Sequence, residues 1–109
     1  MACEVNQTSI EMGMLAMENR DYITATQIFS NAIIEVNNSN PDYWCCLAES
    51  LFYQSHFESA LQCWHEAAAK NPTSKEIWVR ISALYALLEQ DDLAIHYYKI
   101  SEDLPIDDE

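Results

Sequence analysis

Apolar and small residues recur along this chain at intervals of 34 or 35 positions. Trp44 is followed 34 residues later by Trp78, and Ala60 by Ala94. A fainter copy of the same pattern lies 35 residues upstream, at Gly13, Ala25, Phe29 and Ala32. A period near 34 that holds a helix, a short turn and a second helix is typical of stacked helical hairpins. The pattern therefore predicts an all-α fold.

Turn-forming residues divide the chain into six expected helices. The clearest break is the run Asn-Asn-Ser-Asn-Pro at residues 37–41, and a second is Asn-Pro-Thr at 71–73. The apolar periodicity predicts helices at about 7–19, 22–37, 41–54, 74–88 and 91–103, with a further helix that follows His56-Phe57 and ends near Lys70. Because the chain has one glycine, we expect it to make little use of tight turns.

The charge balance limits the class of partner. The chain has 18 acidic residues and five basic ones, which gives a formal net charge of −13. Nucleic acid and anionic membranes are poor partners, because binding phosphate requires clustered Lys and Arg. A basic or neutral amphipathic partner is favoured instead.

The N-terminus and the cysteines favour a cytoplasmic protein. Residues 1–10 hold no basic residue and no apolar run of signal-peptide length. No stretch approaches the roughly 20 apolar residues of a membrane span. The four cysteines show no CxxC spacing, so we expect them to be reduced thiols; they are Cys3, Cys45, Cys46 and Cys63.

We expect a binding protein rather than an enzyme. His56, His65 and His96 are scattered, without the i, i+4 pairing of a helical zinc site. One glycine cannot build a glycine-rich phosphate loop. The sequence therefore predicts no catalytic residues, no metal and no cofactor, in keeping with helical arrays that bind through a curved surface.

The repeat resembles the tetratricopeptide repeat (TPR). Counted from Pro41, the second copy supplies the family's positions with Trp44, Leu47, Ala48, Leu51, Ala60, Trp64, Ala67 and Pro72. Counted from Lys75, the third supplies Trp78, Ile81, Ser82, Tyr85, Ala94, Tyr98 and Ser101. Counted from Asn6, the first supplies Met12, Gly13, Ala25, Phe29 and Ala32, with Ser9 in place of the tryptophan. The resemblance implies a single domain over residues 1–109, built from three hairpins (about 6–40, 41–74 and 75–108) in a short right-handed solenoid with a concave groove. Residues 104–109 are expected to form an acidic tail.

Most of the repeat positions are expected to pack the fold. Gly13, Ala48 and Ser82 are small, which lets the paired helix approach closely. The aromatic residues Phe29, Trp64 and Tyr98 are expected to fill the space between successive hairpins.

The resemblance also implies which residues line the groove. In TPR proteins, a second stripe on the first helix of each hairpin faces the concave side. The equivalent residues here are mostly apolar, with acidic ones among them: Ile10, Met14, Met17, Glu18, Cys45, Glu49, Phe52, Tyr53, Val79, Ala83 and Leu87. Such a stripe suits an amphipathic helix or an extended apolar segment; the alternative is that some of these residues bury against the next hairpin. The positions that grip a C-terminal carboxylate in TPR co-chaperones hold one basic residue here, Arg80, so a carboxylate clamp is not expected.

A second interface is expected at the C-terminal end of the array. A stripe spaced by three and four residues, which a fourth hairpin would ordinarily cover, consists of Leu93, Tyr97, Ile100 and Leu104. An apolar stripe of this kind is covered by the tail, by a second copy or by a partner.

Length, repeat number, acidity and groove polarity together resemble the small TPR-type chaperones of bacterial type III secretion, in particular the needle-subunit chaperones. That resemblance implies a cytoplasmic chaperone that holds the amphipathic helix of a secreted needle or filament subunit and prevents premature polymerisation. It also implies a second small co-chaperone as a partner, and leaves room for a homodimer when no client is bound. The alternatives are a general TPR scaffold for protein–protein contacts and a chaperone of translocator proteins.

Overall fold

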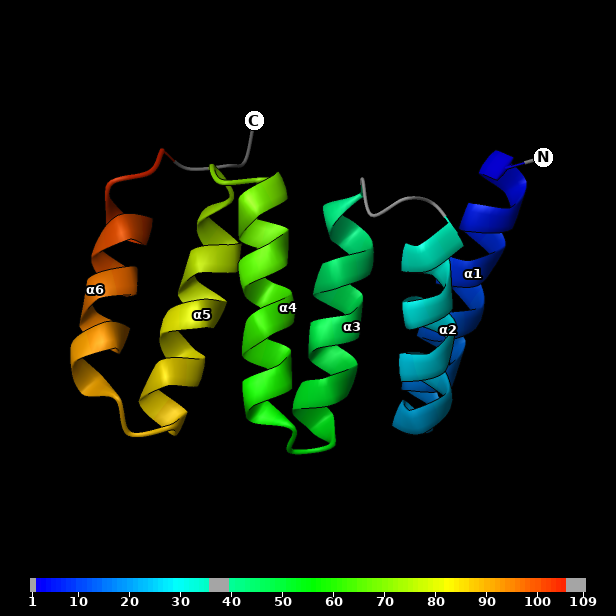
Figure 1. Ribbon diagram of the computed structural model, residues 1–109, viewed down its shortest axis with the longest axis horizontal. Helices are drawn as coiled ribbons and strands as arrows, with labels where there is room; N and C mark the ends of the chain where they lie inside the picture. The colour runs from blue at the N-terminus through cyan, green and yellow to red at the C-terminus, as the bar shows by residue number, and fades with distance from the viewer. Residues whose placement is uncertain (1, 36–39, 106–109) are drawn as a thin grey trace.

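In the part of the chain that the structure describes, six helices lie side by side in a row, from α1 at one end to α6 at the other (Figure 1). The computed structural model describes residues 2–35 and 40–105, with only the backbone described for residues 2–8 and 35. The helices are α1 (Ala2–Glu18), α2 (Tyr22–Glu35), α3 (Pro41–Tyr53), α4 (Phe57–Lys70), α5 (Lys75–Leu87) and α6 (Asp91–Glu102). Consecutive helices pack against each other, so three hairpins stack along a longest dimension of 42 Å. The expected all-α fold of three stacked hairpins is confirmed.

The helix boundaries follow local chemistry. Pro41 is the first residue of α3, where its missing N–H costs nothing, and the Asn40 side chain accepts a 2.9 Å hydrogen bond from the Asp42 amide. The expected start of the first helix, near Gln7, is wrong: α1 begins at Ala2. Residues 2–6 contain neither Gly nor Pro, so nothing in that stretch stops the helix. Residues 36–39 and 106–109, which include the end of the expected second helix and most of the acidic tail, lie outside the described residues.

The turn inside each hairpin is tight, although no glycine is used. Arg20, Ser55 and Glu89 have φ values of 63°, 66° and 63°, in the left-handed region that favours glycine. In the first turn, the Arg20 amide donates to the Met17 carbonyl at 3.0 Å and the next amide donates to a carbonyl five residues back at 2.8 Å. The other two turns repeat both bonds. This pattern ends the first helix of every hairpin in the same way, and it corrects the expectation of few tight turns.

The core lies between the helices of each hairpin and between successive hairpins. Phe29 and Trp64 are buried, as expected for aromatic residues between hairpins. Tyr98 occupies the same repeat position but is 48% exposed, because no helix packs beyond α6 in the described part of the chain. Gly13 lies against the Phe29 ring so closely that a side chain there would overlap it.

A polar network joins the first hairpin to the second. The Thr26 hydroxyl of α2 lies 2.9 Å from the hydroxyl of Ser50 on α3, which is fully buried. The Gln54 side-chain amide donates to the same Thr26 hydroxyl at 2.7 Å and to the Tyr22 carbonyl at 3.3 Å. Because buried hydrogen bonds demand fixed geometry, the network sets how α2 lies against α3.

Candidate partner-binding groove

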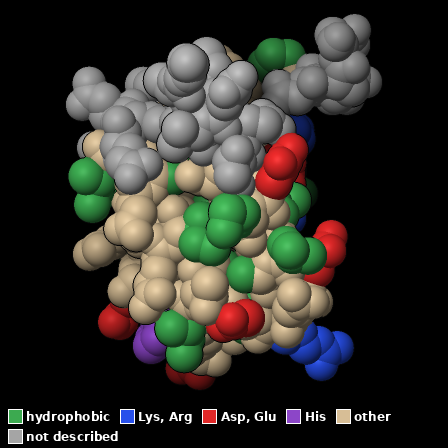
Figure 2. Space-filling model, turned by 90° about the vertical axis from the view of Figure 1, so that its right-hand side faces the viewer, with side chains coloured by type: hydrophobic (Ala, Val, Ile, Leu, Met, Phe, Trp, Pro, Cys, Tyr) green, Lys and Arg blue, Asp and Glu red, His purple; other side chains and the backbone are tan. Residues whose placement is uncertain are grey.

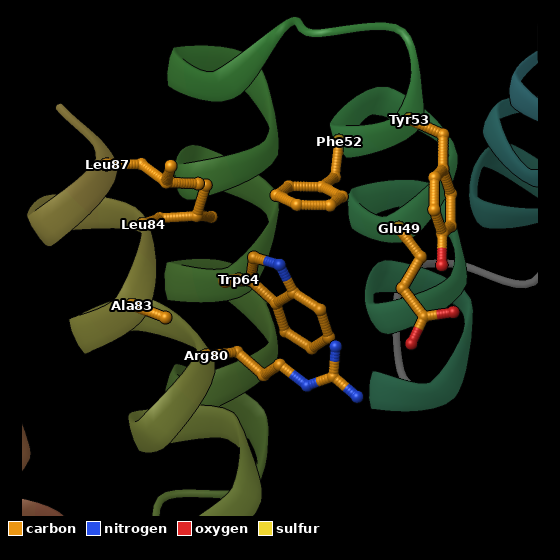
Figure 3. Close-up of a pocket in the computed structure, with 8 residues that line it drawn as sticks. All are labelled: Glu49, Phe52, Tyr53, Trp64, Arg80, Ala83, Leu84 and Leu87. Atoms are coloured by element: carbon orange, nitrogen blue, oxygen red, sulfur yellow. The ribbon is translucent and has the colours of Figure 1, made fainter.

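A pocket with a volume of about 170 Å³ lies between α3 and α5, with α4 behind it (Figure 3). Its lining residues come from three helices: Glu49, Phe52, Tyr53, Trp64, Arg80, Ala83, Leu84 and Leu87. Figure 3 shows the rings of Phe52 and Trp64 near the centre, with Leu84 and Leu87 facing them from α5. This is the first pocket, and its walls are largely apolar.

The floor and the rim of the first pocket differ in exposure. Trp64 and Leu84 are buried, so they form the floor. Phe52 is 37% exposed and Leu87 is 54% exposed, so both still present apolar surface to solvent. The Phe52 ring is held at its edge by Phe57, with ring centres 5.5 Å apart. A preformed, partly open apolar site of this kind is typical of a binding surface.

Arg80 brings the one positive charge among the residues that line the first pocket. Its guanidinium carbon lies 5.8 Å from the centre of the Trp64 ring, in cation–π contact. A guanidinium nitrogen also donates to the Glu76 carboxylate at 3.3 Å, one turn back on α5. These two contacts engage the charge within the protein, so it is only partly free for a ligand carboxylate.

A second pocket, with a volume of about 300 Å³, lies beside the first and reaches α1. Its lining residues are Met14, Met17, Glu18, Tyr22, Phe29, Cys46, Glu49 and Tyr53. The Tyr22 and Tyr53 rings stack there with centres 5.0 Å apart and planes 17° from parallel. Glu49 and Tyr53 line both pockets, so the two hollows adjoin each other along α3, between α1 and α5. We call the two together the inner groove.

The structure brings together eight of the eleven residues predicted to line a groove: Met14, Met17, Glu18, Glu49, Phe52, Tyr53, Ala83 and Leu87. Their role in binding stays a prediction. Three predicted residues lie elsewhere: Ile10 and Cys45 are partly buried against the core, and Val79 is half-buried and lines neither pocket. Cys46 and Arg80, the neighbours of Cys45 and Val79 in sequence, line the pockets in their place.

Sequence reasoning missed the residues that the second helices and the floor contribute. Trp64 was assigned to packing alone, yet its indole is both buried core and pocket floor. Tyr22 and Phe29 lie on the second helix of their hairpin, and Leu84 lies on α5 outside the predicted stripe. A stripe on the first helices could not identify any of the three. The repeat position that Phe29 and Trp64 share, between successive hairpins, is the signal that could have found them.

The thiols of α3 lie beside this groove in an environment that keeps them protonated. Burial raises the pKa of the Cys45 thiol to about 12, and the nearby Asp42 carboxylate adds to the shift. Burial, followed by the Glu49 carboxylate, raises the pKa of Cys46 to about 11. Since the thiolate is the reactive form, these cysteines are unsuited to nucleophilic chemistry.

The predicted second interface is wrong in one residue. Tyr97 faces α5, where its ring stacks on Tyr85 at 5.2 Å and on Trp78 at 5.8 Å between ring centres. His65 of α4 completes this aromatic cluster, and its Nε2 lies 3.1 Å from the Tyr85 hydroxyl. Spacing by three and four residues does not say which side of α6 faces α5, so it could not identify Tyr97 as a residue of the inner side.

The remaining residues of that interface are partly open. Leu93 is exposed, while Ile100 and Leu104 are half-buried. Two residues outside the predicted stripe, Ile95 and Tyr98, expose more of their surface than any of the four. The exposed apolar face of α6 therefore lies around Ile95 and Tyr98.

The residues that the structure describes show neither a cluster of metal ligands nor a membrane span. No three side chains of His, Cys, Asp or Glu gather there as a metal ion would require. None of the described helices combines the length and the apolar character needed to cross a bilayer.

Comparison with known proteins finds one repeat model that matches part of the chain. Residues 41–74, which contain α3 and α4, match the model of the tetratricopeptide repeat. A search of curated protein sequences found no match.

Solved structures with the same arrangement of helices share few residues with this chain. MamA of AMB-1 superposes with a TM-score of 0.80 at 17% identity, over 91% of this chain and 54% of that one. The TPR domain of Arabidopsis OM64 superposes with a TM-score of 0.82 at 19% identity, over 93% of this chain and 83% of that domain. The Yersinia enterocolitica type III secretion translocator chaperone SycD superposes with a TM-score of 0.85 at 8% identity, over 92% of this chain and 75% of that one.

The chain spans about half the length of that MamA structure. At these identities, the likeness is one of fold. The second hairpin therefore matches one tetratricopeptide repeat, and the three stacked hairpins share their fold with these solved structures, a type III secretion translocator chaperone among them.

Proposed function

We propose that this chain is a protein-binding module that holds an apolar helical segment of a partner in the inner groove, and that it serves as a cytoplasmic export chaperone. The observation that carries the proposal is that the two pockets of the inner groove adjoin. They share Glu49 and Tyr53, and the first helices of all three hairpins contribute to their lining. A partner helix laid across them would meet mostly apolar side chains, with carboxylates among them.

The chemistry of the groove favours an amphipathic partner with basic flanks. Phe52, Leu84 and Leu87 offer sites for large apolar side chains, each contributing about 1.5–3 kcal/mol on full burial. Met14 and Met17 are flexible and polarisable, so that side of the groove adapts to irregular shapes. Glu18 and Glu49 lie among these residues and attract Lys or Arg on the partner.

The proposed client is a needle or filament subunit that polymerises through an apolar helical face. Covering that face keeps the subunit monomeric until export, and a second small co-chaperone would complete the complex. A translocator is the second candidate client, since the fold resembles SycD, which is itself a translocator chaperone. In either case the inner groove is the binding site.

The test is peptide binding measured by fluorescence anisotropy. The probe is an amphipathic helix of about 14 residues, roughly 21 Å long, with a Leu/Ile stripe and a Lys at each end. The same residues in a scrambled order that forms no stripe serve as the peptide control. We expect the first to bind and the second not to bind, because only the first presents a continuous apolar face.

The matched variants are Phe52→Asp and Ile34→Asp. Phe52 lines the first pocket, whereas Ile34 is a more exposed apolar residue that lines neither pocket. Phe52→Asp should weaken the peptide complex by about 2 kcal/mol or more, which is over tenfold in Kd, and Ile34→Asp should leave it unchanged. Unaltered binding by a Phe52→Asp protein with a native melting curve would contradict the groove assignment. Co-expression with a needle subunit or with a translocator then tells the two clients apart.

A further inference from the structure

The contact between successive hairpins occurs twice within the chain, and it uses the same repeat positions each time. Between α2 and α3, Thr26 lies opposite Ser50, with their hydroxyls 2.9 Å apart. At the same positions one hairpin later, Leu61 of α4 and Leu84 of α5 are both buried. The first contact is polar and the second is apolar, so this pair of positions accepts either chemistry.

The same two positions recur once more, one at each end of the row. Leu15 of α1 stands 35 residues before Ser50, and it is 57% exposed. Ile95 of α6 stands 34 residues after Leu61, and it is 55% exposed. Both are apolar, as are the buried residues Leu61 and Leu84. The chain therefore exposes both halves of a contact that it buries inside.

A second pair of positions behaves in the same way. Leu47 on α3 and Ile81 on α5 are buried, yet their counterpart Met12 on α1 is 55% exposed. The buried aromatic positions of α2 and α4 recur on α6 as Tyr98, which is about half exposed. We call Met12 with Leu15 the leading end, and Ile95 with Tyr98 the trailing end.

Figure 2 looks along the row onto the side of the molecule where α1 lies. Exposed hydrophobic side chains lie near the middle of this view and also toward its left and lower edges, with acidic side chains beside them. Exposed apolar surface framed by polar residues is typical of a site that contacts another protein.

We propose that the trailing end of one copy packs on the leading end of the next, so that copies stack head to tail. Ile95 of one copy would meet Leu15 of its neighbour, at the repeat positions where Thr26 meets Ser50 inside the chain. Tyr98 would be covered by Met12 of the neighbouring copy, as Phe29 and Trp64 at the same repeat position are covered inside the chain. Such an interface is heterologous: each copy uses two different surfaces, and the assembly can grow.

Charge sets the conditions for this stacking. Each copy carries a formal net charge of −13, so neighbouring copies repel each other at low salt. Glu102 adds a local charge at the trailing end, because its counterparts Ile33 and Ala68 are buried within the chain. Stacking should therefore be weak at low ionic strength and strengthen in about 1 M NaCl, where the Debye length is about 3 Å.

The test uses sedimentation velocity on the whole chain, over a range of concentration and salt. We expect the average mass to rise with both. Leu15→Glu and Ile95→Glu should each give a monomer, because each destroys one half of the interface. Ile34→Glu is the matched control: it makes the same change at a more exposed isoleucine whose counterparts, Ala69 and Asp103, are also exposed, and it should assemble as the wild type does.

Mixing the two end variants separates head-to-tail stacking from other arrangements. The Leu15→Glu protein keeps its trailing end and the Ile95→Glu protein keeps its leading end, so the mixture should form a 1:1 dimer of twice the monomer mass and nothing larger. A wild type that stays monomeric at high salt would overturn the proposal. Self-association that Ile95→Glu abolishes but Leu15→Glu leaves intact would overturn it too, since two trailing ends would then be meeting each other.

Discussion

Gly13→Ala should destabilise the protein, although alanine is the better helix former. Gly13 lies within α1, where alanine is favoured by about 1 kcal/mol. An added Cβ would lie 2.5 Å from Cε1 and 3.0 Å from Cε2 of the Phe29 ring. Carbon atoms in contact lie about 3.5–4 Å apart, so the ring or the helix must move by roughly 1 Å.

The size of the effect follows from the limited space around the ring. Phe29 is fully buried between the hairpins, so the only free space beside it is the second pocket, which it lines. Overpacking of this kind costs about 1–3 kcal/mol, against about 1 kcal/mol gained in helix propensity. The net loss should be about 1 kcal/mol, or roughly 5 °C in Tm for a domain of this size.

The assay is chemical and thermal unfolding of a double-mutant cycle. Phe29→Leu removes the ring atoms that the new Cβ would meet, so the two changes should couple favourably by about 0.5 kcal/mol or more. Ala48 holds the equivalent position in the second hairpin, where an alanine is fully buried. A Gly13→Ala protein that melts at a higher temperature than the wild type, or a cycle with no coupling, would refute the reasoning.

Three further predictions concern the core, the aromatic cluster and the thiols. Ser50→Ala should lower the free energy of unfolding by about 1 kcal/mol, measured in urea, because it removes a buried hydroxyl bonded to α2. Burial lowers the pKa of His65 below its usual value of 6.5, so as the pH falls the unfolded chain protonates this imidazole before the folded chain does. The free energy of unfolding of the wild type should therefore be at its full value above pH 6.5 and should decline below it. In thermal melts, the decline between about pH 7 and pH 5.5 should be steeper for the wild type than for His65→Gln, and equal slopes would contradict it. In a folded Cys3→Ala protein at about pH 8, Cys45 and Cys46 should react slowly with a disulfide reagent, because burial raises their pKa values and keeps them as thiols. After denaturation both should react quickly. Fast reaction in the native state would count against the burial of these two thiols.

Much of the fold could be predicted because the 34-residue period carries information from one hairpin to the next. The second hairpin has the strongest pattern, and its Phe52 and Tyr53 indicated where the inner groove lies on the other first helices. Met14 and Met17 were identified by this transfer alone, in a repeat that lacks the tryptophan. Periodicity is reliable here because each hairpin meets nearly the same neighbours.

What could not be predicted depends on side-chain direction and on the ends. Adjacent residues on a helix point about a quarter turn apart, so the choice between Val79 and Arg80 needs the helix rotation that packing decides. Tyr97 and Tyr98 exchanged their expected roles for the same reason. At Arg20, no residue type marks the left-handed turn, since hydrogen bonds between the helix end and its turn impose it.

The packing of each helix on its neighbours in sequence also shapes how the molecule opens. Substantial contacts join consecutive helices, so the topology is local and no long loop must close before the structure gains stability. The outer hairpins are held on one side and the middle hairpin on two, which makes fraying from the ends less costly than loosening the centre.

Amide hydrogen exchange should therefore be slowest in α3 and α4, and equal rates in all the described helices would show a single cooperative unit. Glu49 and Tyr53, at the middle of the groove, would stay ordered while α1 swings away. A client would then be admitted by a partial, reversible loosening at one end, without unfolding of the whole chain.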